Sequence, residues 1–494
     1  MNASSWLSRG TDKLRFSVMP ADVAAAMQPL RAALAAQAPA VAPKAAKAGR
    51  AMRERLQATL RQQPEALSPR ALRRLLAELR AIIDPHVSEV EGGRRGKALA
   101  QWYAAATLQE RSDLWLLMSE QFVADQKAAK SAQAQYAAAV GTPDEAVAEV
   151  RLRRATVSPR RRLLQRISVF PEGIRFLVDL RAEMLPHLKA DKRLQALDVE
   201  MEYMFSTWFD VAFLDLRRIS WDSPASLIEK LIRYEAVHDV RGWDDMKNRL
   251  DSDRRCYGFF HPRLPDDPLI FVEVALMDEI AGSITPLLDE TAAPADLEKA
   301  TTAIFYSISN TQNGLRGVSF GDSLIKRVVE TLKDEFPRLK TFATLSPIPG
   351  FRQWLHKHAA NLLEQAGDKI RAELGRAAGG KELTAEAVLT AIDKPLALHA
   401  KSPLRAFLLS CAAQYLGREQ HLGKPVDPVA RFHLGNGARI ERLNWAGDPS
   451  AKGQKQSYCL MVNYLYDLKR LDKHRALLAQ GKIPISGAIE ELYF

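Results

Sequence analysis

The segment from Phe305 to Leu355 places the strongest constraint on the fold, because it reads as strand, glycine-bearing loop, helix and strand in succession. The segment 305–309 is short, rich in residues that favour β-structure and followed by the turn residue Asn310, so it predicts a strand. The helix that follows is indicated by apolar residues at helical spacing, namely Leu324, Ile325, Val328, Val329 and Leu332. Residues 340–345 predict a second strand, which the proline- and glycine-containing run from Ser346 to Gly350 ends.

The loop between this strand and this helix contains three glycines, which let the backbone approach another group closely. They are Gly314, Gly317 and Gly321. Free backbone N–H groups and the helix dipole favour a phosphate at such a helix start. The segment taken alone predicts a phosphorylated ligand about as strongly as it predicts a purely structural strand–turn–helix unit.

Length and composition indicate an ordinary globular protein of more than one domain. The chain has 494 residues, of which 47% are hydrophobic and 26% charged. No apolar run approaches the roughly 20 residues that span a bilayer. The three cysteines, Cys256, Cys411 and Cys459, show no CxxC spacing, which argues against a disulfide framework or a zinc site and suits a reducing compartment.

The formal net charge of +11 predicts an anionic partner. The basic residues are dispersed along the chain, and the tightest runs, Arg151–Arg154 and Arg160–Arg162, contain no interleaved aromatic residues. This pattern does not resemble a nucleic-acid-binding module. A small polyanionic ligand fits the same charge without requiring nucleic acid.

The sequence predicts an α+β multidomain protein in three parts: a weakly structured extension at 1–50, a helical bundle at 51–205 and a mixed domain at 206–494. Ser68-Pro69 and Ser158-Pro159 predict helix starts, and residues 142–145 predict a capping box with Glu145 at its third helical position. Strands appear only after Trp208. An all-α part followed by mixed elements favours an all-α domain before an α+β or α/β domain.

In the mixed domain, four further elements are expected. Leu269–Leu276 predicts a strand entered by a turn at Pro265–Pro268, and Ala359–Leu374 predicts one helix. Arg439–Trp445 and Tyr458–Tyr466 predict two more strands, the second of them buried.

Several blocks in the mixed domain carry a resemblance to a known family. They are Asn313–Val318, the Ser-Pro-Ile-Pro-Gly-Phe run at 346–351, and Phe432–Ala438, supported by Trp221–Ser226, Tyr234–His238 and Phe260–Pro262. With these blocks, in this order, the chain resembles malonyl-CoA decarboxylase from about residue 66 to its end. The resemblance implies an N-terminal helical domain and a C-terminal catalytic domain of the GNAT acyltransferase type.

The resemblance also assigns a candidate site. The family's acyl-CoA-binding run falls on Arg316, Gly317, Val318, Ser319, Phe320, Gly321 and Asp322. Ser319 stands where the GNAT loop pattern has its middle glycine. The family's catalytic serine matches Ser346, as proton acceptor, and its catalytic histidine matches His433, as proton donor; both also bind substrate. By position alone a structural role is favoured, in which Ser346 caps the following helix and His433 satisfies a buried turn.

The implied reaction converts malonyl-CoA to acetyl-CoA and CO2 through an enolate that is protonated at C2. The thioester accepts the electrons of the departing carboxylate, so we expect no metal and no organic cofactor, coenzyme A being part of the substrate. A histidine suits proton delivery near pH 7. The alternatives are an acyl-CoA-dependent acyltransferase on the same fold, and a non-catalytic helical scaffold.

The sequence and the resemblance also lead to expectations about binding partners and location in the cell. We expect malonyl-CoA and acetyl-CoA as ligands, no nucleic acid, no membrane, and self-association as a dimer or tetramer. The C-terminal residues Glu490–Phe494 do not form a Ser-Lys-Leu peroxisomal signal. Without that signal or a convincing transit peptide, the expected location is the cytoplasm.

Overall fold

The computed structural model describes residues 67–318, 324–379 and 383–493. The predicted extension at 1–50 and four members of the predicted coenzyme-binding run, Ser319, Phe320, Gly321 and Asp322, therefore lie outside the described residues. The chain divides into two compact units. Among described residues, one unit comprises 67–76 and 107–113, and the other comprises 77–106 and those from 114 onward.

The described part of the first unit contains the starts of two helices, α4 (Pro69–Ile82) and α6 (Leu108–Gln121). Ser68 Oγ accepts a hydrogen bond from Ala71 N, which confirms the predicted start of α4. Thr107 and Glu110 form a reciprocal capping box, since the Thr107 N–H donates to the Glu110 carboxylate and the Glu110 N–H donates to Thr107 Oγ1.

The second unit begins with a helical region. Its helices are α5 (Glu89–Ala105), α7 (Gln126–Ala139), α8 (Glu145–Thr156), α9 (Pro159–Ile167), α10 (Gly173–Met184) and α11 (Gln195–Trp208). The predicted start of α9 is confirmed, because Ser158 Oγ accepts from Arg160 N. The predicted capping box at 142–145 is wrong, since α8 begins at Glu145 itself and the Glu145 carboxylate accepts from Gly141 N.

A mixed sheet follows the helical region, as the sequence predicted. Its strands are β1 (Asp215–Ile219), β2 (Arg254–His261), β3 (Leu264–Met277), β4 (Thr302–Asn310), β5 (Thr341–Thr344), β6 (Ser346–Pro347), β9 (Arg439–Asn444) and β10 (Met461–Leu465). The spatial order is β1-β2-β3-β4-β5-β10-β6, and β9 pairs with β10. Of these pairs, β4–β5 is parallel and the others are antiparallel. The described fold is therefore α+β.

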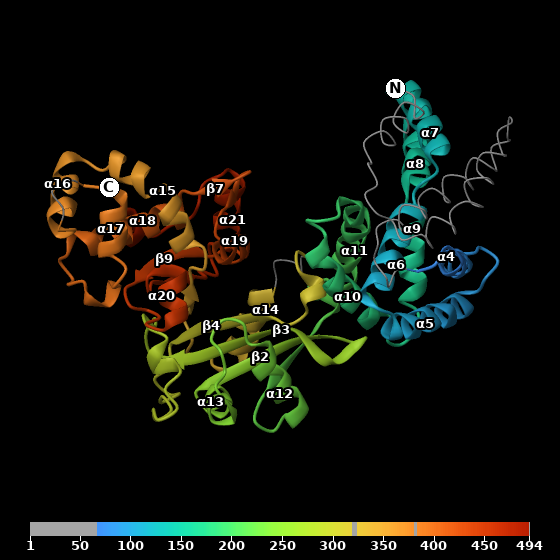
Figure 1. The fold of residues 1–494 in the computed structure, drawn as a ribbon. Helices are drawn as coiled ribbons and strands as arrows, with labels where there is room; N and C mark the ends of the chain where they lie inside the picture. Colours follow the sequence, from blue (N-terminus) through green and yellow to red (C-terminus); the bar gives the residue numbers. More distant parts are fainter. Residues whose placement is uncertain (1–66, 319–323, 380–382, 494) are drawn as a thin grey trace, which may run out of the picture. The chain divides into compact units, whose positions relative to one another are not determined.

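Helices cover the sheet on both faces (Figure 1). On one face, α12 (Ala225–Tyr234) and α13 (Trp243–Arg249) pack apolar side chains against β1, β2 and β3. On the other face, α14 (Leu324–Glu335) buries the stripe of apolar residues that the sequence indicated. β4 and β5 pair only as far as Phe305 and Thr344, so beyond that point β4 is paired with β3 and no longer with β5.

The C-terminal part adds helices and a short hairpin of β7 (Gln420–His421) and β8 (Lys424–Pro425). The helices are α15 (Phe351–Gln365), α16 (Asp368–Ala377), α17 (Ala385–Ala391), α18 (Pro403–Gly417), α19 (Pro428–Gly435), α20 (Ala451–Ser457), α21 (Leu471–Ala479) and α22 (Gly487–Glu490). The single helix predicted at Ala359–Leu374 is wrong, because extended backbone at Ala366 and Gly367 separates α15 from α16.

Two of the expected boundaries also differ. The strand predicted at Tyr458–Tyr466 starts only at Met461, because Tyr458 and Cys459 have positive φ angles of 54° and 64°. The turn predicted at Pro265–Pro268 belongs to β3, and the chain turns earlier, at Pro262 and Arg263. Neither tyrosine nor cysteine indicates a positive φ angle, so the later start of β10 could not be predicted from the residue types.

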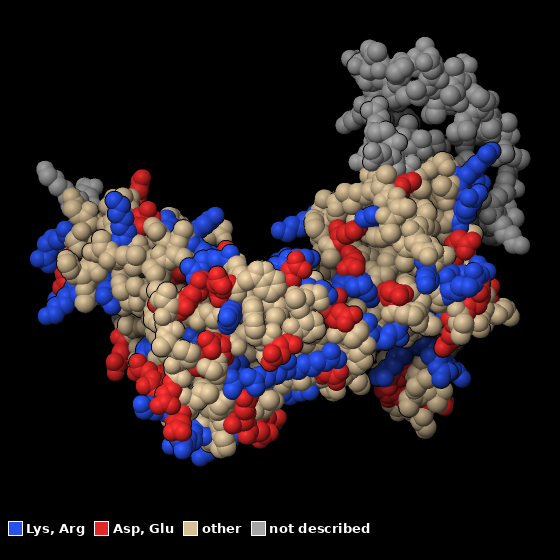
Figure 2. Space-filling model, turned by 90° about the horizontal axis from the view of Figure 1, so that it is seen from below, with Lys and Arg blue, Asp and Glu red and all other residues tan. Residues whose placement is uncertain are grey.

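The charged side chains are dispersed over the visible surface, as the sequence predicted (Figure 2). Figure 2 shows basic and acidic side chains interspersed over the visible face. None of the helices in the described residues combines the length and apolarity needed to cross a membrane.

Candidate active site

Ser346 lies on β6, directly after β5, and is buried. This strand has only two residues, and it pairs with β10 through Val462 opposite Ser346. Pro347 and Pro349 lack backbone donors, so the ladder cannot continue, and the chain enters α15 after Gly350. Ser346 Oγ donates a hydrogen bond to Thr344 Oγ1 at 2.8 Å. The serine is thus fixed at the point where β5 ends.

His433 lies in the last turn of α19 and is also buried. Its Nε2 is 3.3 Å from Ser346 Oγ, although 87 residues separate the two in sequence. Its Nδ1 is 2.7 Å from the hydroxyl of Tyr466. The imidazole stacks on Tyr464, with ring centroids 4.7 Å apart and planes 25° apart. The structure therefore brings together the two residues that the sequence nominated as a pair.

The donors and acceptors around His433 form one directed chain. The Tyr466 hydroxyl donates to Nδ1, Nε2–H then donates to Ser346 Oγ, and Ser346 Oγ donates to Thr344 Oγ1. This assignment of the neutral tautomer follows from the hydrogen-bond network, since it gives every member of the chain one compatible role. The exchangeable proton of His433 consequently points at Ser346.

Burial governs the ionisation of this cluster. It lowers the pKa of His433 from 6.5 to about 3, because the charged imidazolium loses its hydration. Burial also raises the pKa of Tyr466 far above its ordinary value. Both side chains are therefore neutral near pH 7 in the free protein.

We expect the wild-type protein to lose more stability than a His433→Gln variant when the pH falls from 6.5 to 4. The unfolded chain protonates His433 below pH 6.5, whereas the folded chain does so only near 3. Stability therefore rises with pH across this window, by up to about 1.4 kcal/mol per pH unit from this residue. Urea unfolding at a series of pH values measures the difference. His238, whose pKa burial lowers to about 4, contributes to both proteins alike. Parallel pH profiles would contradict a buried neutral His433.

Asp427 holds α19 in place. Its carboxylate accepts the N–H groups of Val429 and Ala430 at 2.9 Å each, which caps the helix that carries His433. The Tyr415 hydroxyl of α18 donates to the same carboxylate at 3.3 Å. Burial raises the pKa of Asp427 to about 6, and hydrogen bonds from these amides and from the Gly350 N–H oppose that rise. One buried carboxylate thus links the helix of His433 to the turn that follows Ser346.

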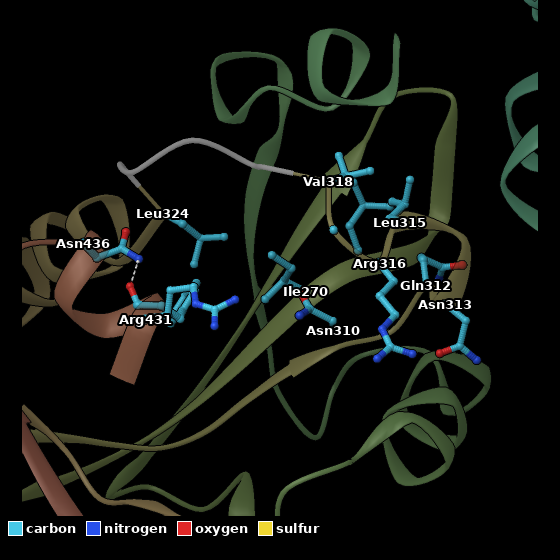
Figure 3. Close-up of a pocket in the computed structure, with 14 residues that line it drawn as sticks. Ile270, Asn310, Gln312, Asn313, Leu315, Arg316, Val318, Leu324, Arg431 and Asn436 are labelled. Carbon is cyan, nitrogen blue, oxygen red and sulfur yellow. Dashed lines mark hydrogen bonds between the residues drawn. The ribbon is translucent and has the colours of Figure 1, made fainter. Parts of the chain in front are cut away.

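A pocket of about 450 Å³ is lined in part by α19, the helix that carries His433, although neither Ser346 nor His433 is among its lining residues (Figure 3). Arg431, Phe432 and Asn436 line one side from α19 and its end, and the loop from Gln312 to Val318 lines the other. Leu269 and Ile270 within β3, Asn310 at the end of β4 and Leu324 at the start of α14 complete the wall. Because Phe432 precedes His433 on the same helix, the pocket and the Ser346–His433 pair share α19.

The polar groups of the pocket suit an anionic ligand that also carries amide or base groups. Arg316 and Arg431 supply positive charge from opposite sides. Asn436 Oδ1 is buried and has no hydrogen-bond partner among the described residues. Of the predicted coenzyme-binding run, Arg316, Gly317 and Val318 line the pocket, while the remaining four residues lie outside the described part.

Sequence reasoning did not select several of the residues that surround the pair. Arg431 precedes His433 by two positions, and Tyr464 and Tyr466 alternate within a predicted strand, which places them on one face of it. The alternation was a usable signal for two neighbouring tyrosines. No local pattern could show that this strand faces α19.

No group of three or more His, Cys, Asp or Glu side chains suited to holding a metal ion occurs within residues 67–318, 324–379 and 383–493. All three cysteines are buried, and burial raises the pKa of each of their thiols.

Comparison with known proteins identifies the family. A family described as the C-terminal domain of malonyl-CoA decarboxylase matches residues 212–493, and one described as its N-terminal domain matches residues 122–209. The mitochondrial malonyl-CoA decarboxylase of Anser anser anser is 39% identical over 338 residues, 65% of this chain and 66% of that protein. The corresponding protein of Rattus norvegicus is 39% identical over 348 residues, 65% of this chain and 68% of that protein.

Comparison with solved structures indicates the same family. The malonyl-CoA decarboxylase of Rhodopseudomonas palustris superposes with a TM-score of 0.73 at 39% identity, covering 85% of this chain and 99% of that one. That of Cupriavidus metallidurans gives a TM-score of 0.69 at 43% identity, covering 86% and 100%. The protein is thus an enzyme of the carboxy-lyase class. Within that class, the chain belongs to the malonyl-CoA decarboxylase family.

Proposed function

We propose that this protein converts malonyl-CoA to acetyl-CoA and CO2 at the Ser346–His433 pair. The observation that carries the proposal is the 3.3 Å approach of Ser346 Oγ to His433 Nε2, because His433 lies on α19, which also lines a polar pocket with two arginines. A proton donor next to a binding pocket for an anionic ligand is what decarboxylation of an acyl-CoA requires. Membership of the family supports the substrate.

The coenzyme A portion would occupy the pocket, and the malonyl group would reach Ser346. Arg316 and Arg431 supply the positive charge for phosphate groups, and the predicted coenzyme-binding run from Arg316 to Asp322, of which residues 319–322 lie outside the described part, would bind the pyrophosphate. The parallel β4–β5 pair, which ends at Phe305 while β4 stays paired with β3, supports a GNAT-like arrangement in which the acyl chain lies between β4 and β5.

The reaction itself needs one bond broken and one proton delivered. The bond between C2 and the carboxylate breaks, its electron pair moves into the thioester carbonyl, and CO2 leaves an enolate. His433 Nε2–H then passes a proton to Ser346 Oγ, and Ser346 passes its own proton to C2, which gives acetyl-CoA. Positioning of the reacting groups supplies much of the acceleration.

The source of that proton follows from the buried state of His433. In the free protein burial keeps the imidazole neutral, by lowering its pKa to about 3. A malonyl carboxylate bound beside the imidazole raises this pKa again, because a nearby anion favours the protonated form. His433 therefore takes up one proton from solvent as substrate binds and returns it to the enolate. The substrate thioester is the electron sink, so neither a metal nor an organic cofactor enters the scheme.

The remaining expectations stay part of the proposal. We place the enzyme in the cytoplasm, as a homo-oligomer that binds malonyl-CoA and acetyl-CoA, and neither nucleic acid nor a membrane takes part.

Incubation of the purified protein with malonyl-CoA and no acceptor tests the function. We expect chromatography to show acetyl-CoA appearing as malonyl-CoA disappears, with release of CO2. Unchanged malonyl-CoA would contradict the proposal. Consumption that begins only when an amine or alcohol acceptor is added would favour the acyltransferase alternative.

A further inference from the structure

A fully buried arginine of the helical region reaches the loop that lines the coenzyme pocket. Arg181 lies on α10 and its side chain is 1% exposed. Its Nη1 donates to two carbonyl oxygens of that loop, Gly314 O at 2.8 Å and Arg316 O at 2.9 Å. The second carbonyl belongs to a residue that lines the pocket. A single guanidinium nitrogen thus fixes the loop at two points, two residues apart.

The charge of Arg181 is balanced from the neighbouring helix. Asp198 on α11 accepts from Arg181 Nε at 2.8 Å, and the Glu202 carboxylate lies 3.6 Å from Nη2. The two acids are four residues apart, so they share one face of α11. The acids orient the guanidinium, whose planar fork leaves Nη1 directed at the loop.

Backbone packing reinforces this connection. Gly314 lies so close to α10 that a Cβ atom there would come within 1.9 Å of Val178 O. Val178 precedes Arg181 by three residues and shares its helix face. Gly317, further along the loop, has a φ angle of +84°, a conformation that glycine adopts readily. The loop is therefore seated on α10 by contact between main-chain atoms as well as by the arginine.

We propose that α10 and α11 form a platform that holds the pocket loop in its binding conformation, with Arg181 as the positioning residue for the coenzyme A portion of the substrate. This inference rests on the proposed function. A loop held in its bound shape loses less conformational entropy when ligand arrives, so the platform strengthens binding. Arg181 does not touch the reacting atoms, and its effect falls on affinity and not on the chemical step.

The test compares Arg181→Met and Arg181→Lys with wild type. We expect Arg181→Met to raise the Kd for coenzyme A, measured by calorimetry, and the KM for malonyl-CoA by about 10- to 100-fold, the loss typical of hydrogen bonds from a charged donor. The kcat value should stay within about threefold, because α19 and Ser346 are untouched. The lysine variant should recover part of the affinity, since an ammonium keeps the charge but not the fork.

Arg160→Met is the matched control. Arg160 lies in the same helical region, is similarly buried, and donates to the carbonyl of Phe122 and to Ser158 Oγ, away from the pocket. Its loss should lower stability and leave the Kd for coenzyme A unchanged. If Arg181→Met binds coenzyme A within twofold of wild type, or matches Arg160→Met in every parameter, the inference is overturned.

If Arg181→Met does not fold, Arg181→Lys and Asp198→Asn decide, and wild-type affinity in both would overturn the inference. Coenzyme A binding does not depend on turnover. If the wild-type protein binds coenzyme A but leaves malonyl-CoA intact, the proposed function is refuted. The Kd values of wild type and Arg181→Met for coenzyme A would still test the role of α10 and α11.

Discussion

Replacement of His433 by alanine, or of Ser346 by alanine, is expected to lower kcat for malonyl-CoA decarboxylation by about two to four orders of magnitude. The imidazole Nε2 and the serine Oγ are 3.3 Å apart and form the central link of the hydrogen-bond chain that runs from Tyr466 to Thr344. Removing either one interrupts proton delivery to C2. The KM should change less than kcat, because neither residue lines the pocket that is proposed to hold the coenzyme. Steady-state chromatography of malonyl-CoA and acetyl-CoA measures both constants.

Ser457→Ala provides the matched control for this pair. Ser457 is as buried as Ser346, but its hydroxyl bonds only to the backbone carbonyls of Gly453 and Leu460. We expect this variant to keep the wild-type kcat. Acetyl-CoA formation that survives in both Ser346→Ala and His433→Ala would remove these residues from the mechanism while leaving the activity in place.

Gly314→Ala is expected to have the largest effect on stability and substrate affinity among the glycine substitutions in the pocket loop. The new methyl group would lie 1.9 Å from Val178 O, a main-chain atom that no side-chain rotation can move. Either α10 or the loop must shift, which costs about 1–3 kcal/mol in typical overpacked sites. Urea unfolding measures this loss, and we expect the KM for malonyl-CoA to rise with it.

Gly375→Ala separates the steric effect from the mere loss of a glycine. Gly375 lies inside α16, and the nearest atom to its hypothetical Cβ is Leu383 Cβ at 3.8 Å, an ordinary contact, so alanine fits there. We expect Gly375→Ala to be as stable as wild type or up to about 1 kcal/mol more stable. A Gly314→Ala protein with wild-type stability and KM would show that the loop is not seated on α10.

Local patterns predicted much of the fold. The apolar spacing of Leu324 to Leu332 predicted α14, and the serine–proline pairs predicted the starts of α4 and α9. These elements follow from interactions within a few residues. The break between α15 and α16 was not predicted, because apolar residues continue at helical spacing past Ala366. The positive φ angles of Tyr458 and Cys459, which delay the start of β10, were not predicted either, since neither residue type favours positive φ.

In the candidate site, too, the sequence predicted individual residues but not the contacts between distant ones. Ser346 and His433 came from matching short blocks of sequence, and only the fold shows that β6 and α19 place them 3.3 Å apart. The glycine at 314 was predicted to allow a close approach. A phosphate was the expected neighbour, and the structure shows the Val178 carbonyl there. Tyr466 and Arg181 could not be predicted, because each acts on residues dozens of positions away.

The hydrogen bonds of Arg181 bear on how this enzyme could be divided or recombined. A fragment limited to residues 212–493, the span of the C-terminal family match, would contain the Ser346–His433 pair and the pocket lining but not α10 or α11. The carbonyls of Gly314 and Arg316 would then lose their buried donor. An engineer who transplants the catalytic part should carry α10 and α11 with it, or design a new donor for those two carbonyls.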